Sequence, residues 1–233
     1  MIRYHTTLSK LCQIVMCFFI ILGGCRDADD SGMDLSRYYF PIDSLPPDGM
    51  VYVYENLQDT LGDPEVWRHL PAGTGLLESI NYGFGEEIVQ KQYDRVVGNG
   101  VVTDSLVLYA RDSTGQRLAT QVQVLSPHRF PFMPGDTLSV WLTKMEWWQP
   151  EDSLHIVLER RRTFREMTTW EWDGQDIPAV RFRTEDTFET EADGWTSSQW
   201  HGEELYARDI GLVYYKRVIS PEMILEFELV KRE

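Results

Sequence analysis

Hydrophobic and polar side chains alternate along most of the chain from about residue 50 onward, with a period of two rather than the 3.6 of a helix. The clearest run is residues 222–229, where every odd position is apolar and three of the four even positions are glutamate. Such a run has one apolar face and one acidic face. This pattern predicts an antiparallel strand that is buried on one side only.

Several other runs are rich in β-branched and aromatic residues, as strands are. They are residues 51–54, 103–109, 118–125, 138–148, 154–158 and 210–218. Turn-forming sequences separate them, at spacings of about 8 to 15 residues that favour hairpins over βαβ units. We therefore predict an all-β fold, a single strongly curved antiparallel sheet in the form of a half-barrel or barrel-like meander, with at most one or two short helices.

The start of the chain follows a different pattern, because a basic segment precedes a long apolar stretch. Arg3 and Lys10 provide the charge, and residues 11–22 are apolar apart from Gln13. Twelve residues match the apolar region of a secretory signal, whereas spanning a bilayer takes about 20 residues. The pattern therefore predicts a signal peptide over residues 1–24 rather than a transmembrane anchor.

The sequence that ends this segment, Leu22-Gly23-Gly24-Cys25, resembles the bacterial lipobox. In that motif the cysteine thiol is diacylated and the cysteine becomes the mature N-terminus. The resemblance implies a lipoprotein signal peptide, a covalent diacylglycerol anchor on Cys25, and location at the cell outer membrane, with surface and periplasmic orientations both open. An ordinary signal peptide with a coincidental cysteine is the alternative.

Charge and cysteine content narrow the classes of partner and chemistry. A formal net charge of −15 argues against nucleic acid, because binding phosphates requires clustered Lys and Arg. Removal of residues 1–24 leaves 20 basic and 37 acidic residues, a net charge of −17. It also leaves Cys25 as the single cysteine in the sequence, so no thiol remains for a disulfide, a metal site or catalysis.

An acidic segment follows Cys25. Residues 26–32 (RDADDSG) resemble the export tags behind the lipidated cysteine of surface lipoproteins in the Bacteroidota, and a solvated spacer is the alternative. No linker long enough to divide the chain comes later. We therefore predict an acidic tether over residues 25–36 and a single antiparallel β domain over residues 37–233.

Three segments of the β region resemble motifs of small, uncharacterised lipoproteins of the Bacteroidota. Residues 39–54 contain Tyr39-Phe40-Pro41-Ile42, Gly49, Tyr52 and Tyr54, which are similar to a "YFPL…G…W.Y" opening. Residues 205–213 (LYARDIGLV) resemble a "WYA.GVGLV" segment near the C-termini of those proteins, and residues 170–180 fit the strand–turn–strand between. The resemblance implies a curved antiparallel sheet similar to the lipoprotein-carrier (LolA-like) half-barrel.

The same motifs have a structural interpretation of their own. Phe40-Pro41 suits an extended entry that packs an aromatic ring into the core before the first strand. Gly211 lies between two strand-like runs, where a bulge or bend favours a residue without a Cβ atom.

The sequence lacks the motifs that carry catalysis or metal binding. We find no dinucleotide fingerprint, Walker A loop, G-x-S-x-G or H-E-x-x-H. The histidines after residue 24 have no metal-ligand spacing, and we interpret them as surface residues. They are His69, His128, His155 and His201. We predict no catalytic residue, no metal site, and no cofactor apart from the lipid on Cys25.

Charged clusters are interpreted as structural. The pairs Glu86-Glu87 and Glu203-Glu204 could serve acid–base chemistry. In so acidic a chain, however, we interpret them as parts of solvent-exposed faces. Arg160-Arg161-Arg162 is the one basic cluster. In a strand it divides between two faces and pairs with acidic residues of neighbouring strands, with an anion site as the alternative.

Tryptophans are the candidate ligand contacts. Trp141 and Trp147 share one face of a predicted strand, and Trp170 and Trp172 share a face of another. Rings at i and i+2 lie about 7 Å apart, a spacing that suits a core, successive sugar rings or a lipid tail. Because the chain is acidic, we expect a neutral or apolar ligand.

Two classes of function remain open. The first is a non-catalytic binding or structural module of the cell envelope, which holds an apolar or carbohydrate ligand on a concave aromatic face or packs on an envelope protein. The second is a carboxylate-based hydrolase acting on glycans. The absence of a recognisable catalytic motif favours the first. A pocket with facing carboxyl groups would favour the second, and a filled core without a cavity would leave only the interaction role.

Overall fold

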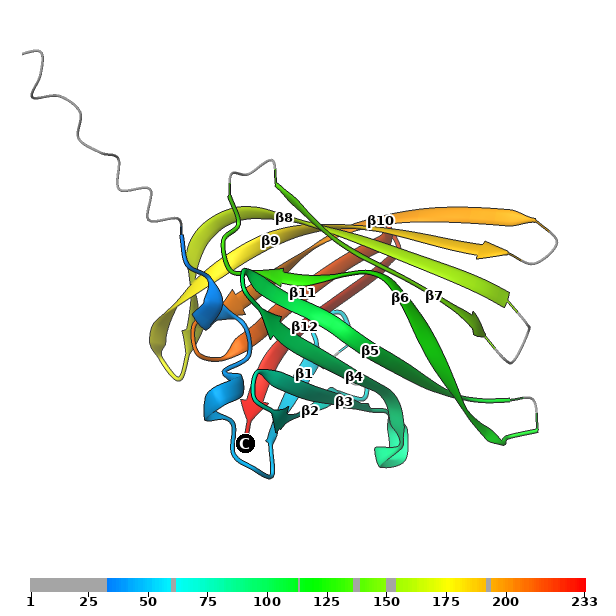
Figure 1. Cartoon of the computed structure of the whole chain (residues 1–233), viewed down its shortest axis with the longest axis horizontal. Coiled ribbons are helices and arrows are strands. Elements are labelled where there is room, and N and C mark those ends of the chain that lie inside the picture. The colour runs from blue at the N-terminus through cyan, green and yellow to red at the C-terminus, as the bar shows by residue number, and fades with distance from the viewer. Residues whose placement is uncertain (1–32, 60–61, 113, 136–138, 150–153, 192–193) are drawn as a thin grey trace, which may run out of the picture. The chain divides into compact units, whose positions relative to one another are not determined.

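Twelve antiparallel strands close into a barrel in this computed structural model (Figure 1). The structure describes residues 33–59, 62–112, 114–135, 139–149, 154–191 and 194–233. The predicted signal peptide, the lipobox with Cys25, and the tether up to residue 32 lie outside these residues. The strands are β1 (Met50–Asn56), β2 (Glu65–Gly73), β3 (Leu76–Tyr82), β4 (Ile88–Val97), β5 (Gly100–Arg111), β6 (Arg117–Pro131), β7 (Val140–Gln149), β8 (Leu154–Trp172), β9 (Gln175–Glu191), β10 (Trp195–Ala207), β11 (Gly211–Ser220) and β12 (Met223–Arg232).

Each strand pairs with its neighbours in the sequence, and β12 pairs with β1 to close the sheet. The described residues contain no α-helix, and their helical turns are three short 3-10 helices. These are η1 (Ser36–Tyr38), η2 (Ile42–Ser44) and η3 (Phe84–Glu86). The prediction of an all-β fold built from one curved antiparallel meander is confirmed. Among the described residues, no helix has the length and apolar character needed to cross a membrane.

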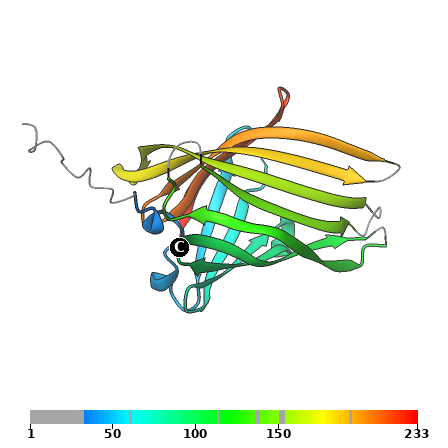
Figure 2. The ribbon, with the colours of Figure 1, turned by 45° about the horizontal axis from the view of Figure 1, so that its top comes forward.

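The strands differ greatly in length. β8 and β9 have 19 and 17 residues, whereas β1 and β3 have seven each. β8, β9 and β10 lie side by side and extend well beyond the short strands (Figure 2). Closure with a period of two places alternate side chains of every strand inside the barrel.

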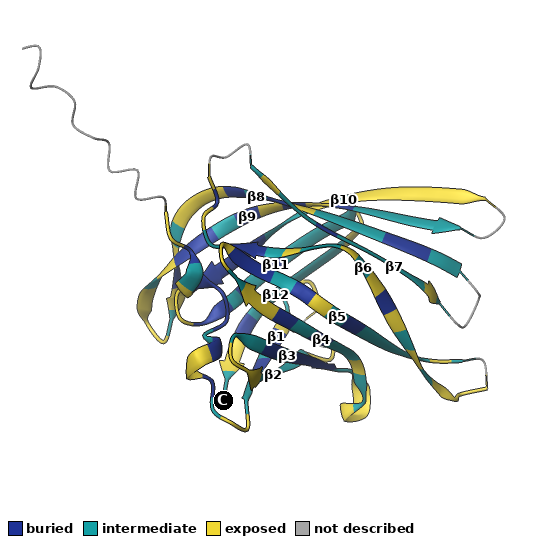
Figure 3. Cartoon of the chain, viewed as in Figure 1, coloured by how far each residue is buried: buried dark blue, intermediate teal, exposed yellow. Residues whose placement is uncertain are grey.

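The segment before β1 fills one end of the barrel, and we call residues 35–45 the plug. Its apolar side chains, among them Leu35, Tyr39 and Phe40, are buried in the main hydrophobic core. Leu35, which falls within the predicted tether, is fully buried, and its backbone N–H donates to the carbonyl of Phe132 at 2.7 Å. Buried residues gather where the plug meets the barrel (Figure 3).

Contacts of the plug explain two residues singled out in the sequence. The Phe40 ring packs against His69 and Tyr52, with centroid distances of 4.0 and 5.6 Å. Gly211 has a φ of +105°, and a Cβ atom there would lie 2.6 Å from Cδ1 of Phe40. The predictions that Phe40 enters the core and that Gly211 must lack a Cβ are therefore confirmed.

Candidate functional site

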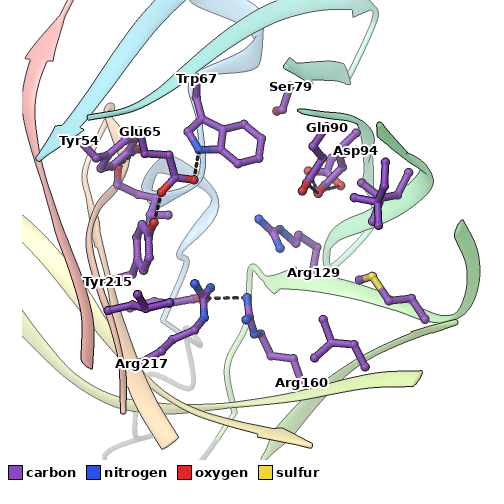
Figure 4. Close-up of a pocket in the computed structure, with 18 of the residues that line it drawn as sticks. Tyr54, Glu65, Trp67, Ser79, Gln90, Asp94, Arg129, Arg160, Tyr215 and Arg217 are labelled. Atoms are coloured by element: carbon purple, nitrogen blue, oxygen red, sulfur yellow. Dashed lines mark hydrogen bonds and ion pairs between the residues drawn. The ribbon is translucent and has the colours of Figure 1, made fainter. Parts of the chain in front are cut away.

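A cavity of about 400 Å³ lies inside the barrel, and all twelve strands contribute to its lining. Phe40 of the plug forms part of the lining at the closed end. This volume is in the usual range for sites that bind small molecules. Figure 4 shows that the polar side chains of the lining converge on this space.

One part of the lining is apolar. It includes Leu106, Leu108, Met145, Trp147, Leu158, Phe188, Trp200, Leu212 and Leu225. Phe188 stacks on Trp200 with a centroid distance of 5.5 Å and meets Trp147 edge to face at 6.4 Å. Three rings from β7, β9 and β10 thus form one continuous surface, which we call the aromatic wall.

An ion-pair network contributes Arg160, Glu204 and Arg217 to the lining. Arg160 donates two hydrogen bonds of 2.7 Å to Asp186, and Arg162 Nε donates to Glu204 at 2.8 Å. Arg217 lies farther from both carboxylates, at 3.5 Å from Asp186 and 3.9 Å from Glu204. Three guanidinium groups therefore share two carboxylates in a largely buried network, where charges are stable only when paired.

The carboxylates of this network are held in the charged form. Burial alone would raise the pKa of Glu204, but the charges of Arg162 and Arg160 outweigh it and hold that pKa well below the ordinary value. Asp186 shows the same balance, with burial opposed by Arg160, and its pKa is also lowered. Neither group is available to hold a proton near neutral pH.

Two further carboxylates, Asp94 and Glu65, are satisfied mainly by neutral donors. Asp94, which is 1% exposed, accepts hydrogen bonds from Tyr39 at 2.7 Å, Thr103 at 2.9 Å, and Gln92 at 2.7 and 2.8 Å. Glu65 accepts from Trp67 Nε1 at 2.7 Å and from the Tyr215 hydroxyl.

Arg129 has no such partner. Its side chain lines the cavity and points into it between Asp94 on one side and Arg217 on the other (Figure 4). Its Nε is buried without a hydrogen-bond partner, and within the described part of the chain it makes no ion pair. Burial opposes the charge, but Asp94, Tyr206, Tyr39 and Glu204 together outweigh it, and the pKa of Arg129 lies above the ordinary value. The cavity therefore contains a charged guanidinium without a contact partner.

Arg129 reaches the cavity through a β-bulge. In the pairing of β5 with β6, Val101 is opposite Phe130 and Val102 is opposite His128, so Arg129 is the extra residue. A bulge interrupts the alternation of side chains, so a neighbour of the core residue Phe130 can also face inward. Regular alternation along the sequence could not have placed Arg129 inside.

His69 also lines the cavity and is 3% exposed. Its Nδ1 lies 2.9 Å from Ser79 Oγ, and its Nε2 has no hydrogen-bond partner. Burial, followed by the charges of Arg129 and Arg232, lowers the pKa of His69 to about 3, so the ring is neutral. The interpretation of His69 as a surface residue is wrong, because the rings around it and the packing of the plug remove it from solvent.

The other predictions for charged residues are mixed. The arginine cluster divides as expected, because Arg160 and Arg162 join the inner network while Arg161 pairs with Glu159 at 2.7 Å and is exposed. Glu204 is buried, so its interpretation as part of a solvated face is wrong: the inner arginines compensate its charge. Groups of three or more His, Cys, Asp or Glu able to hold a metal do not occur among the described residues.

The four predicted tryptophans do not gather in one place. Trp147 lines the cavity, and Trp141 borders a separate hollow of about 240 Å³ next to Phe130. Trp170 stacks on Trp172 with a centroid distance of 5.0 Å, and the pair packs in the main core rather than along the cavity.

Sequence reasoning did not identify most of the lining. Phe188 and Trp200 meet only because β9 and β10 pair, and no local pattern reveals that pairing. Trp67 and His69 do alternate along β2, which was a usable signal for a shared face.

No protein-family model and no curated protein matches the chain. Among solved structures, a candidate lipoprotein of Parabacteroides distasonis aligns with 81% of this chain and 97% of its own, at 10% identity and a TM-score of 0.48. The hypothetical lipoprotein YmcC of Escherichia coli aligns with 79% of this chain and 87% of its own, at 10% identity and a TM-score of 0.37. Likenesses of this size do not assign the chain to a family or a function.

Proposed function

We propose that this protein is a membrane-anchored bacterial lipoprotein that serves the cell envelope as a non-catalytic binding module, holding an apolar ligand inside its barrel. The observation that carries this proposal is the cavity of about 400 Å³ with its aromatic wall. A barrel without such a function would be expected to fill its interior with side chains, because close packing stabilises the fold.

The composition of the lining favours an apolar ligand over a carbohydrate. Besides the aromatic wall, the cavity presents six aliphatic side chains, namely Leu106, Leu108, Met145, Leu158, Leu212 and Leu225. Contact between a hydrocarbon chain and this aliphatic surface removes apolar area from water and so favours binding. A sugar bound there would leave its hydroxyl groups without hydrogen-bond partners.

The inner carboxylates count against a glycan hydrolase. Such an enzyme needs a carboxylic acid with a raised pKa to protonate the leaving group. Arginine neighbours lower the pKa of both Glu204 and Asp186, and two strong hydrogen bonds hold Asp186 on Arg160. Both are therefore structural anions of the network.

The anchor is proposed from the sequence. The apolar segment and Leu22-Gly23-Gly24-Cys25 imply acylation of Cys25 and attachment to the outer membrane. The acidic residues 26–32 then act as a tether that leads to the barrel. Mass spectrometry of the mature N-terminus tests this part: a diacylated Cys25 supports it, and an unacylated residue contradicts it.

Ligand binding is tested with the mature chain, residues 25–233, produced without the signal peptide so that Cys25 stays free of lipid. The neutral apolar dye N-phenyl-1-naphthylamine is titrated and its fluorescence is followed. Leu108→Trp introduces a larger ring at a lining position, and Val107→Trp places the same ring one residue away, outside the lining. We expect Leu108→Trp to abolish the fluorescence increase and Val107→Trp to keep it. Equal binding by both variants would contradict the proposal.

A further inference from the structure

The polar groups of the cavity indicate what the head of its ligand should be. Arg160, Arg162 and Arg217 share Asp186 and Glu204, so this network carries one positive charge more than its carboxylates neutralise. The pKa of Arg217 reflects this excess of positive charge. Burial and the charge of Arg160 lower that pKa more than the two carboxylates raise it.

Arg129 is a second cation of the cavity, and it makes no ion pair with any of the described carboxylates. Asp94 is the carboxylate whose charge acts most strongly on Arg129. Its oxygens, however, already accept hydrogen bonds from Tyr39, Gln92 and Thr103. The guanidinium group of Arg129 has lost part of its hydration in the cavity, and its buried Nε has gained no hydrogen bond in return. An anion between Arg129 and Arg217 would compensate both groups.

His69 lies in the same cavity with a neutral ring and an unpartnered Nε2. When the Ser79 hydroxyl donates to Nδ1, Nε2 carries the proton and is free to donate. A buried donor that no protein group satisfies is uncommon and calls for a partner such as a ligand. Its presence beside a charged guanidinium strengthens the case for an oxyanion.

The cavity is also polarised along the barrel axis. Arg129 lies at the level of Val101 and Val102, near the plugged end, while Leu106 and Leu108 lie farther along β5. On β10 the order is the same, with the network residue Glu204 nearer the plug and Trp200 of the aromatic wall farther from it. A ligand would therefore place its charged end toward the plug and its apolar end along the wall.

We infer that the ligand is a single-chain amphiphile with a carboxylate head, bound with the head at Arg129 and the chain against the aromatic wall. This inference rests on the proposed binding function and specifies its ligand class. Arg129 presents a planar fork that matches a carboxylate in two hydrogen bonds.

The net charge of the mature chain predicts a neutral or apolar ligand, whereas the arginines of the cavity favour a ligand with a negatively charged head. Charges on the outer surface are screened beyond roughly 8 Å at physiological salt. Inside the cavity, a ligand head placed between Arg129 and Arg217 would meet their guanidinium groups directly, where low-dielectric surroundings strengthen the attraction between close opposite charges.

The test compares ligands that share one chain and differ in the head. Dodecanoate, dodecanol and dodecyl phosphate are titrated into the unacylated mature chain by calorimetry, each below its micelle concentration. We expect dodecanoate to bind about 10-fold to 100-fold more tightly than dodecanol, as hydrogen bonds to charged groups imply. Equal affinity for the two, or tighter binding of the phosphate, overturns the inference while the proposed function stands. Binding of none of the three overturns the proposed function as well.

A substitution at Arg129 tests whether this residue causes the preference for a carboxylate head. Arg129→Met should remove most of the preference for dodecanoate and leave dodecanol binding nearly unchanged. Arg161→Met, which removes an exposed arginine of β8 that pairs with Glu159, is the matched control and should keep the preference. An unchanged preference in Arg129→Met overturns the inference. If that variant does not fold, the comparison of heads on the unmodified chain decides alone.

Discussion

Asp94 and Arg129 line one cavity, and Asp94 helps to raise the pKa of Arg129, but the two form no ion pair. The carboxylate of Asp94 is surrounded by Tyr39, Gln92 and Thr103, each of which donates a hydrogen bond to it. Tyr39 belongs to the plug, so Asp94 joins the plug to the barrel wall. Arg129 is left facing the cavity. One carboxylate thus stabilises the closed end and leaves a cation available for a ligand.

The first prediction concerns Asp94. Asp94→Asn should destabilise the fold by about 2–3 kcal/mol, because the amide nitrogen would face buried donors and leave them unsatisfied. Asp104→Asn is the control, since Asp104 is partly exposed and pairs with Arg95 at the surface. That change should cost no more than about 1 kcal/mol. Urea unfolding measures both, and equal costs would show that Asp94 does not have this structural role.

A second prediction concerns Gly211. Gly211→Ala should cost about 2–4 kcal/mol, because the new Cβ would meet the Phe40 ring as well as strain the backbone. Gly174→Ala provides the comparison, since Gly174 also has a positive φ, +73°, but its Cβ would meet nothing within 4 Å. Backbone strain alone, about 1–2 kcal/mol, is expected there. Thermal unfolding of the two variants should rank them in this order, and the reverse order would contradict the packing of Phe40 on Gly211.

The third prediction is a pH dependence due to His69. Its pKa of about 3 in the folded state lies below the ordinary value of 6.5, so between these values the unfolded chain binds the extra proton. Stability should therefore fall as pH decreases from about 6.5 toward 3, by up to about 1.4 kcal/mol per pH unit from this group. In His69→Phe this contribution should be absent, and an unchanged slope in urea unfolding would refute it.

The same histidine can be followed directly by NMR. The imidazole signals of His69 should show no titration between pH 5 and 8. A midpoint for His69 within this range would show that the ring is not buried in solution.

A fourth prediction concerns the inner network. Glu204→Gln should destabilise the fold by about 3–5 kcal/mol, because it leaves Arg162 buried without its main counter-charge. Glu203→Gln, one residue away on the same strand, loses the partly exposed ion pair with Arg181 and should cost about 1 kcal/mol or less. Urea unfolding distinguishes them, and similar costs would contradict the assignment of Glu204 to the interior.

The fold was largely predictable because period-two alternation reports directly on a half-buried strand. Residues 222–229 illustrate this, since Leu229 of that run is buried in the core and Leu225 lines the cavity. Phe40 and Gly211 were also predictable, because an aromatic ahead of the first strand and a glycine between strands each have a local physical reason.

The site was predicted only in part, since its residues meet through long-range pairing. Trp147 was identified because alternation places it on one face with Trp141, but alternation groups Trp170 with Trp172 in the same way, and that pair packs in the core. The position of Arg129 inside the barrel could not be predicted, because a bulge breaks the alternation on which such predictions rest. The burial of His69 depends on the packing of Phe40 from the plug, and the sequence around His69 does not reveal that contact.

The central claim is that an apolar chain lies in the barrel cavity, and locating that chain tests it most directly. The mature chain would be crystallised with an alkyl carboxylate that carries bromine at the end of its chain, and the bromine would be located by anomalous scattering. We predict a bromine peak inside the barrel against Trp147, Phe188 or Trp200. Bromine found only on the outer surface, with an empty barrel, would contradict the account.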